Sequence, residues 1–316
     1  MTSAAPLVSV IMPCYNAAAY IEEAIGSVMA QTHPAVELIV VDDGSRDASP
    51  TVVERLGQRY PGRIRLASQV NAGPYPARNQ GLRLARGDYV AFLDADDWWR
   101  EDFVAKLLAV VDVDDTVALA YCGWQNVGQG VQSSPHVPAA YESDDPVAHF
   151  LRSCPWPIHA ALIRRGVVDR LGGFSVRRFA SMDYDFWLRL LGLTQRIVRV
   201  PEVLAFYRWH GADQISAVKW RQVLDALDAQ LAFIREHPQL VAHLSAATLK
   251  DLTEGQVLRQ AYRALWKRDL VSAQKLFRHA AARGGYGWRD LAHVATALLP
   301  LPLYRGLARI ADRRDA

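Results

Sequence analysis

Short apolar runs and amphipathic segments alternate through the first hundred residues of the chain. The apolar runs have the length and β-branched content of buried strands, and a segment with helical spacing of its apolar positions separates each from the next. The predicted strands are Val8–Met12, Glu37–Val41, Ile64–Ala67 and Tyr89–Leu93. The predicted helices are Ala17–Ala30, Thr51–Tyr60 and Ala77–Ala85. Strands joined by single helices imply right-handed crossovers, so we expect an α/β fold with a mostly parallel sheet flanked by helices.

The pattern becomes wholly helical in the last third of the chain. Before that point, the sequence predicts helices near 102–111 and 183–191, strands at 117–122, 160–164 and 203–209, and a loop rich in Gly, Ser and Pro at 128–145. Beyond it, the predicted helices are Trp220–His237, Leu240–Lys267 and Ser272–Arg283. We therefore expect an α/β domain over residues 1–212 and a helical extension over residues 213–316.

Composition narrows the class of protein. The 316 residues are 51% hydrophobic and 22% charged, which is enough for one sizeable core and a smaller appended one. The three cysteines lie far apart and lack C-x-x-C spacing, so we expect neither a zinc site nor a disulfide framework. The first residues carry no signal-peptide pattern, and a reducing cytoplasm is the expected location.

Charge is distributed unevenly along the chain. The net charge is +3, yet residues 251–316 contain 12 Lys and Arg against 6 Asp and Glu. No basic stripe interleaved with aromatic residues occurs in the first domain, so we expect no nucleic-acid partner. The basic C-terminal end needs a separate explanation.

Three carboxylates follow directly on the strand that begins at Tyr89. In Asp94-Ala95-Asp96-Asp97, strand alternation would place Asp94 and Asp96 on one side. These charges repel each other unless a hard cation and a bound phosphate lie between them, so a divalent metal with a nucleotide diphosphate would fit. The alternative is a solvated acidic turn, and we expect Asp97 to cap the following helix.

Two further turns lie at the ends of predicted strands. In Pro13-Cys14-Tyr15-Asn16, the proline would end the first strand's ladder and expose Tyr15 for stacking on a flat base. Asn16 could instead cap the next helix, and both functions are compatible. In Asp42-Asp43-Gly44-Ser45, the carboxylate of Asp43 could accept from a base N–H and a ribose hydroxyl. The alternative is that Asp43 or Ser45 caps the helix that follows.

A third turn precedes an arginine. Asn71-Ala72-Gly73 supplies a flexible turn, and Arg78 lies near the start of the helix that follows. A guanidinium there could pair with the phosphates of a bound nucleotide diphosphate or with Asp94. The alternative is a solvated arginine, because Arg83 and Arg86 follow closely.

Together with Met182-Asp183-Tyr184-Asp185-Phe186-Trp187-Leu188-Arg189, these turns form five motifs in a characteristic order. In this order the chain resembles the family 2 glycosyltransferases with a GT-A fold, and the resemblance runs from about Val8 to His210. It implies a Rossmann-like catalytic domain over residues 1–212, followed here by a helical extension.

The resemblance also implies roles for individual residues. Asp183 would be the catalytic base, Asp96 would hold the metal, and His210 of the segment Tyr207-Arg208-Trp209-His210 would reach the metal or the diphosphate. Met182 occupies the position of the family's commoner Glu. The residues expected to bind the donor are Pro13, Tyr15, Asn16, Asp43, Arg78, Asp94, Asp96 and His210.

The function implied is inverting sugar transfer that depends on Mg²⁺ or Mn²⁺. The donor would be a nucleotide diphosphate sugar, with a UDP-sugar favoured, and the acceptor a hydroxyl of a glycan or a lipid-linked glycan. Two alternatives remain at this point: a nucleotidyltransferase that makes an activated sugar, and a nucleotide-sugar-binding module without catalysis. Against the former, no Gly-rich phosphate loop follows the first strand.

The basic C-terminal end carries a dense apolar series. Residues 288–314 contain many leucines, interrupted by Pro300 and Pro302 and flanked by arginines. Such a segment is a poor spanning helix, but its apolar face would fit an anionic membrane surface, which would make the protein peripheral at the inner face of the cell membrane. The alternative is that the leucines pack back onto the helical extension as core.

Overall fold

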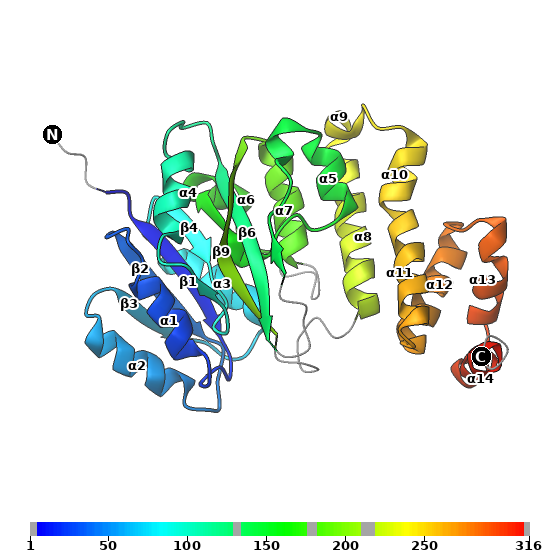
Figure 1. Cartoon of the computed structure of the whole chain (residues 1–316), viewed down its shortest axis with the longest axis horizontal. Helices are drawn as coiled ribbons and strands as arrows, with labels where there is room; N and C mark the ends of the chain where they lie inside the picture. Colours follow the sequence, from blue (N-terminus) through cyan, green and yellow to red (C-terminus); the bar gives the residue numbers. More distant parts are fainter. Residues whose placement is uncertain (1–4, 129–133, 176–181, 210–218, 313–316) are drawn as a thin grey trace. The chain divides into compact units, whose positions relative to one another are not determined.

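The computed structural model describes residues 5–128, 134–175, 182–209 and 219–312 (Figure 1). The chain divides into two compact units. The first unit comprises Met1–Pro146, Cys154–Arg177 and Arg189–Gln214, and the second comprises Val147–Ser153, Arg178–Leu188 and Ile215–Ala316. The division into domains at residue 212 stays a prediction, since this grouping assigns two earlier segments to the second unit.

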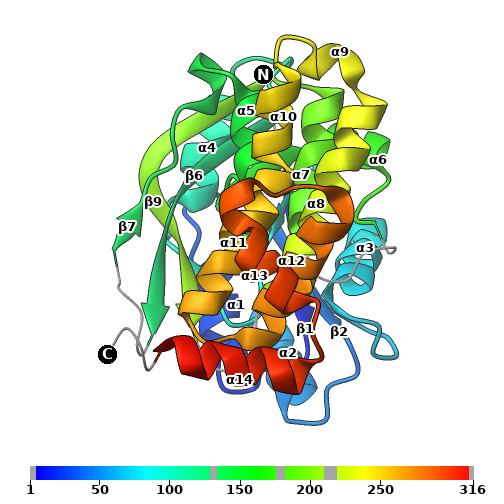
Figure 2. The ribbon, with the colours of Figure 1, turned by 90° about the vertical axis from the view of Figure 1, so that its right-hand side faces the viewer.

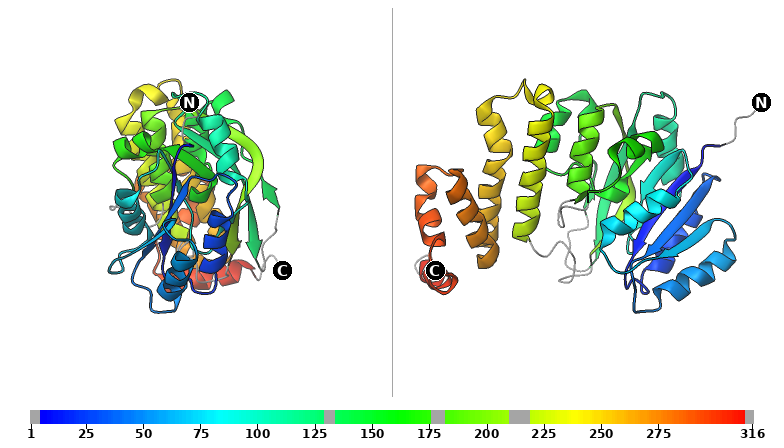
Figure 3. Two further views of the ribbon diagram at one scale, coloured as in Figure 1. Left: turned by 90° about the vertical axis from the view of Figure 1, so that its left-hand side faces the viewer. Right: turned by 180° about the vertical axis from the view of Figure 1, so that it is seen from behind.

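The first unit is built on one nine-stranded sheet with the order β3-β2-β1-β4-β8-β6-β9-β5, and β7 pairs with β6. The pairs β1–β2, β1–β4, β2–β3 and β6–β9 are parallel. Seen from behind in Figure 3, the blue strands of the first hundred residues form one end of this sheet. The strands are β1 (Val8–Cys14), β2 (Val36–Asp42), β3 (Ile64–Ser68), β4 (Tyr89–Phe92), β5 (Trp98–Trp99), β6 (Leu119–Gly128), β7 (Pro135–His136), β8 (Ala161–Arg164) and β9 (Ile197–Trp209). The predicted mostly parallel α/β sheet is confirmed.

Continuous apolar sequence explains the central strands. Every residue of β1 and β2 is buried, as expected for parallel strands covered on both faces. The polar exceptions are paired: Ser9 donates to Glu37 through Oγ at 2.6 Å, and Arg86 donates to the same carboxylate. Burying these groups is tolerated because each has a partner.

The helices of the first 193 residues are α1 (Ile21–Met29), α2 (Ser49–Arg59), α3 (Pro74–Leu84), α4 (Phe103–Val111), α5 (Pro146–Arg152), α6 (Arg165–Leu171) and α7 (Met182–Leu193). Helix α1 begins four residues after the predicted start, because the backbone N–H groups of Ala17 and Ala18 bond to Ser49 and Asp47 instead. Helix α3 begins at Pro74, earlier than predicted, since a proline in the first turn needs no N–H partner.

Strands β6 and β9 are longer than the sequence predicts. They pair in parallel from Leu119↔Ile197 to Gly128↔Trp209, with irregularities beside Gly123. Figure 2 shows them side by side, with β7 along β6. The bulge accommodates polar and glycine residues that interrupt the apolar pattern, which is why the pattern alone ended β6 early and started β9 late.

The second unit contains the helices that follow residue 218. They are α8 (Lys219–Glu236), α9 (Pro238–Val241), α10 (Ala246–Leu252), α11 (Glu254–Trp266), α12 (Leu270–Arg283), α13 (Leu291–Ala297) and α14 (Leu301–Asp312). The single helix predicted at Leu240–Lys267 is wrong. Ser245 caps α10 by accepting from the N–H of Thr248, and the backbone of Thr253 leaves helical geometry before α11.

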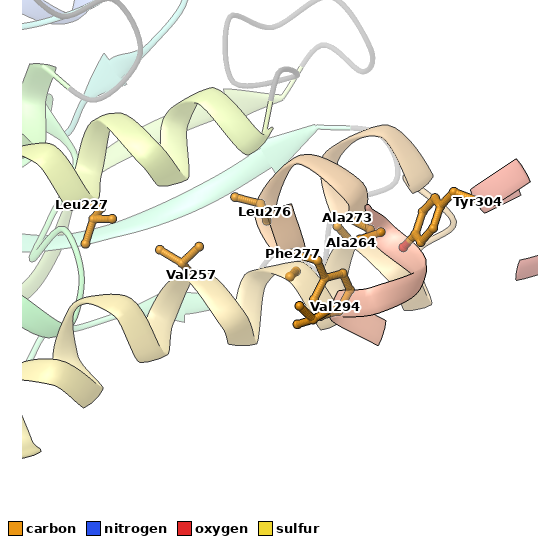
Figure 4. Close-up of a cluster of buried hydrophobic side chains, with 10 residues drawn as sticks. Leu227, Val257, Ala264, Ala273, Leu276, Phe277, Val294 and Tyr304 are labelled. Atoms are coloured by element: carbon orange, nitrogen blue, oxygen red, sulfur yellow. The ribbon is translucent and has the colours of Figure 1, made fainter. Parts of the chain in front are cut away.

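A compact apolar cluster holds these helices together. Phe277 of α12 is fully buried within this cluster (Figure 4). Its ring meets the ring of Tyr262 edge-on, with the centroids 5.1 Å apart. Helices α11 and α12 lie side by side, with α14 crosswise to α12 (Figure 2). The buried members of the cluster are Leu227, Val257, Ala261, Ala264, Ala273, Leu276, Phe277, Val294, Ala297 and Tyr304. Among the helices described, none is long and apolar enough to cross a membrane.

One buried amide joins four helices of the second unit. Gln230 of α8 is 4% exposed, and its Nε2 donates to the carbonyls of Leu151 (2.6 Å) and Leu252 (3.3 Å) and to the hydroxyl of Tyr184 (3.1 Å). The amide thereby satisfies buried carbonyl groups at the ends of α5 and α10.

We predict that Gln230→Ala lowers the free energy of unfolding by about 1–3 kcal/mol, because it leaves buried carbonyls without a donor. Urea denaturation followed by circular dichroism measures the change. Gln239→Ala, at an exposed position of α9, is the matched control and should stay near wild type. Equal midpoints for both variants would contradict the prediction.

Candidate functional site

The acidic turn lies between β4 and β5, at the carboxyl end of a parallel strand. The N–H of Leu93 donates to the carbonyl of Ile11, and the N–H of Asp97 donates to the carbonyl of Asp94, which closes the turn. The side chains of Asp94 and Asp96 are partly exposed, whereas Asp97 is buried. This edge is where open α/β sheets bind their ligands, so the two accessible carboxylates lie in the expected place.

Arg78 of α3 is fixed beside this turn. It is 3% exposed, and its Nη2 lies 2.6 Å from Oδ1 of Asp94. Its guanidinium also lies over the rings of Tyr75 and Phe174, 5.2 and 5.5 Å from their centroids. The alternative of a solvated arginine is therefore wrong, and the predicted pairing with Asp94 is confirmed.

Asp43 connects two loops. Its carboxylate accepts from the backbone N–H groups of Ala72 (2.9 Å) and Gly73 (2.8 Å) and from Nε2 of Gln69 (2.7 Å). Gly73 has a φ of 95°, a conformation that glycine adopts without strain. Helix α2 has Ala48 at its N-cap and no side-chain capping bond, so the alternative of Asp43 as a cap is wrong.

The turn after β1 is hydrogen-bonded to the loop that follows β2. Asn16 has a φ of 51°, and its Oδ1 accepts from the N–H of Arg46 at 2.8 Å, so it does not cap α1. Tyr15 is 49% exposed, as an aromatic that stacks on a ligand must be. Pro13 does not end the strand: β1 continues beside β2 through Cys14, and only the pairing with β4 stops, at Ile11.

Asp97 has a different environment from the one predicted. It does not cap a helix; Oδ1 accepts the N–H of Arg208, and Oδ2 lies 3.2 Å from Nδ1 of His159. Arg208 also donates through Nε to the carbonyl of Asp96 at 2.9 Å. The side chains of Asp97 and His159 are 1% and 0% exposed, so the acidic turn has a buried polar base.

Burial shifts the pKa of both side chains of this pair. Desolvation, followed by the carboxylates of Asp96 and Asp94, raises the pKa of Asp97 well above its usual range. Desolvation lowers the pKa of His159 to about 4. Both pKa shifts disfavour the charged form, because burial removes each side chain from water.

The predicted base lies on another element. Asp183 occupies the first turn of α7 and is partly exposed, while Asp185, two residues on, is buried. Helix α7 starts at Met182, immediately before Asp183. His210 lies outside the described residues, so its predicted role in donor and metal binding stays a prediction.

The carboxylates of the acidic turn fit a divalent ion that takes most of its ligands from phosphate oxygens and water. Within the described ranges, no three His, Cys, Asp or Glu side chains converge as a closed metal site. Mg²⁺ and Mn²⁺ commonly bind through one or two carboxylates plus phosphate oxygens and water. Asp94 and Asp96 provide such a partial set, although Asp94 is already bonded to Arg78.

Sequence reasoning missed the support of this turn. His159 and Arg208 contact the acidic motif although they lie far from it in sequence, and Gln69 contacts Asp43 in the same way. The pairing of β5 with β9 brings Arg208 to the turn. Only the expectation that His210 of the segment Tyr207-Arg208-Trp209-His210 would reach the metal or the diphosphate pointed towards this strand. Nothing in the spacing indicated His159.

Comparisons with known proteins agree with this arrangement. The family described as Glycosyl transferase family 2 matches residues 9–185. TuaG of Bacillus subtilis, a glycosyltransferase assigned to teichuronic acid biosynthesis, is 33% identical over 225 residues, which cover 70% of this chain and 86% of TuaG. EpsH from the same organism, also assigned as a glycosyltransferase, is 33% identical over 335 residues, which cover 97% of this chain and 94% of EpsH.

Solved structures share the fold. Residues 1–349 of S. aureus TarS superpose with a TM-score of 0.63 at 17% identity, covering 98% of this chain and 92% of that one. The mannosyltransferase PcManGT from Pyrobaculum calidifontis, in complex with GDP-Man and Mn²⁺, gives a TM-score of 0.58 at 22% identity, covering 96% of this chain and 83% of that one. With the family match spanning more than half of its length, this chain belongs to the family 2 glycosyltransferases.

Proposed function

We propose that the protein is an inverting, metal-dependent glycosyltransferase that moves a sugar from a UDP-sugar to a hydroxyl of a glycan or lipid-linked acceptor. The observation that carries this proposal is the pair of partly exposed carboxylates, Asp94 and Asp96, at the carboxyl end of β4 beside the buried Arg78. Family membership argues against the nucleotidyltransferase alternative. TarS solved with UDP-GlcNAc supports a uridine donor.

The donor would lie across the loops that follow β1, β2 and β4. In this proposal the exposed ring of Tyr15 stacks on the base, while Pro13 and Asn16 shape that turn. Asp43 retains acceptor capacity beyond the bonds it receives from its own loops, and this capacity would receive a base N–H.

Asp96 would hold the divalent ion, with His210 as a second protein ligand, while Asp94 contacts the ribose or sugar. The ion would supply positive charge that stabilises the leaving diphosphate. Arg78 adds a cation that its ion pair with Asp94 holds in a fixed position, so it costs no reorganisation as negative charge develops.

The reaction would be a single displacement. The acceptor oxygen forms a bond to the anomeric carbon as the bond from that carbon to the diphosphate oxygen breaks, which inverts the configuration. Asp183 accepts the hydroxyl proton, and the bonding electrons leave with the diphosphate. The position of Asp183 in the first turn of α7, with a partly exposed side chain, supports its role as the base.

We predict that Asp183→Asn lowers turnover by roughly 10²-fold or more and leaves the dissociation constant for UDP near wild type, because the change removes the base and little else. Release of nucleotide diphosphate measures turnover, and calorimetry measures binding. Asp169→Asn, on the exposed side of α6, is the control for loss of a carboxylate. Wild-type turnover in Asp183→Asn would sink the mechanism.

A second prediction concerns the metal. Asp96→Ala should abolish the increase in UDP affinity that Mn²⁺ provides, because the main protein anchor for the ion is gone. Titrations of UDP with and without Mn²⁺ measure this difference. An unchanged metal effect in the variant would place the ion elsewhere.

We further propose that residues 288–314 contact an anionic membrane surface. Val294, Ala297 and Tyr304 are buried in the cluster of the second unit, so the packing alternative accounts for part of the segment. Other apolar side chains remain exposed, which supports the membrane proposal: Trp288 (76%), Leu291 (52%), Leu298 (60%), Leu303 (58%) and Leu307 (43%).

The spacing of the exposed leucines matters for this contact. Leu291 and Leu298 are separated by seven positions and lie on one face of the segment, and Leu303 and Leu307 form an i,i+4 pair on α14. Arg289 lies against the ring of Trp288, at 5.1 Å, in the manner of an interfacial anchor. An acceptor carried on a lipid would be met at such a surface.

Serine substitutions of the exposed leucines test the proposed membrane contact. Replacing Leu291, Leu298 and Leu303 by Ser should weaken binding to phosphatidylglycerol vesicles by at least about 10-fold, because apolar area is no longer removed from water. Co-sedimentation at low salt measures the bound fraction. Val70→Ser with Val113→Ser, which changes exposed residues of the first unit, is the matched control. Recovery of the unaltered chain in the supernatant would leave the segment purely structural.

A further inference from the structure

We infer that His159 is a positioning residue: through Asp97 it fixes the acidic turn so that the carboxylate of Asp96 is held in place for a divalent ion. This inference rests on the proposed metal dependence and adds a residue that none of the five motifs contains. His159 belongs to the 3₁₀ helix Ile158–Ala160, which immediately precedes β8.

The first observation is the burial of two polar side chains against each other. Nδ1 of His159 lies 3.2 Å from Oδ2 of Asp97, and the side chains are 0% and 1% exposed. Nδ1 and Nε2 of His159 and Oδ2 of Asp97 have no hydrogen-bond partner among the described residues, so Nδ1 and Oδ2 are in close polar contact without forming a hydrogen bond. Removing such groups from water costs stability, and packing alone would be achieved at lower cost by two apolar side chains of similar volume.

The second observation is how Asp97 connects to the proposed metal ligand. Its Oδ1 accepts the N–H of Arg208 at 2.8 Å, and Arg208 Nε donates to the carbonyl of Asp96 at 2.9 Å. The guanidinium also lies 4.4 Å from the ring centroid of Trp98. The Asp96 carbonyl is therefore bonded to Arg208, and the next residue, Asp97, is bonded to Arg208 through Oδ1 and contacts His159 through Oδ2.

His159 is itself held firmly. Its ring stacks on Tyr207 with a centroid distance of 5.7 Å and an interplanar angle of 12°, and its carbonyl accepts Nε1–H of Trp99 at 2.8 Å. An imidazole restrained in this way cannot follow a shift of Asp97, so it restricts where Asp97 lies. Groups that orient a metal ligand in this way typically change metal affinity about 10- to 100-fold when they are lost.

The test measures metal binding without turnover. Free Mn²⁺ is followed by electron paramagnetic resonance during titration of the full chain in saturating UDP. We expect His159→Leu to weaken Mn²⁺ binding by about 10- to 100-fold while UDP binding without metal stays near wild type. His159→Asn, which retains an N–H near the position of Nδ1, should restore affinity to within a few-fold of wild type.

A double-mutant cycle identifies the route. If His159 acts through Asp97, adding His159→Leu to Asp97→Asn should weaken Mn²⁺ binding less than it does in the wild type. Full additivity would overturn the proposed route. His159→Gln, which places its amide near Nε2, is the variant to compare with His159→Asn if His159→Leu does not fold; equal Mn²⁺ affinity in these two variants would overturn the inference.

The outcomes separate this inference from the proposed function. Wild-type Mn²⁺ affinity in a folded His159→Leu variant would overturn the positioning role alone. Mn²⁺-independent UDP binding by the unaltered chain, with Asp96→Ala behaving identically, would instead overturn the metal dependence and with it this inference. A loss in His159→Leu that His159→Asn does not restore would show a packing role only.

Discussion

Negative charge concentrated at the end of one strand is the constraint on which this site depends. Three carboxylates occupy four consecutive positions, and in a folded protein they repel one another unless positive or polar groups compensate them. The structure compensates each in a different way. Asp94 pairs with a buried guanidinium, burial and the neighbouring carboxylates raise the pKa of Asp97, and Asp96 remains partly exposed with its carbonyl bonded to Arg208.

The three carboxylates of the turn therefore have three different environments. If all three carboxylates were exposed, the turn would be a solvated acidic patch able to take several ions loosely. Asp94 and Asp97 each contact a protein group, and Asp96 is the carboxylate that the proposed function assigns to the metal. The surrounding sheet supplies the partners from strands that are distant in sequence, since β5 and β9 lie together at its edge.

The sequence predicts the first hundred residues well because each strand there is a continuous apolar run with a turn motif at its end. Periodicity fails where polar contacts decide the geometry. Ser245 and Thr253 interrupt a segment whose apolar spacing is helical throughout. Helix α1 begins later than predicted, where the side chains of Ser49 and Asp47 accept hydrogen bonds from the backbone before it. Motif order identified the acidic turn, but the buried partner of Asp97 depends on a three-dimensional contact with His159 that no spacing encodes.

The three bonds accepted by Asp43 join the loop after β2 to the loop after β3. These loops consequently behave as one mechanical piece rather than as two independent walls. Under the proposed donor binding, a substitution that alters one loop would displace the other loop as well. Variants designed to change the donor would then have to treat residues 42–45 and 69–73 together.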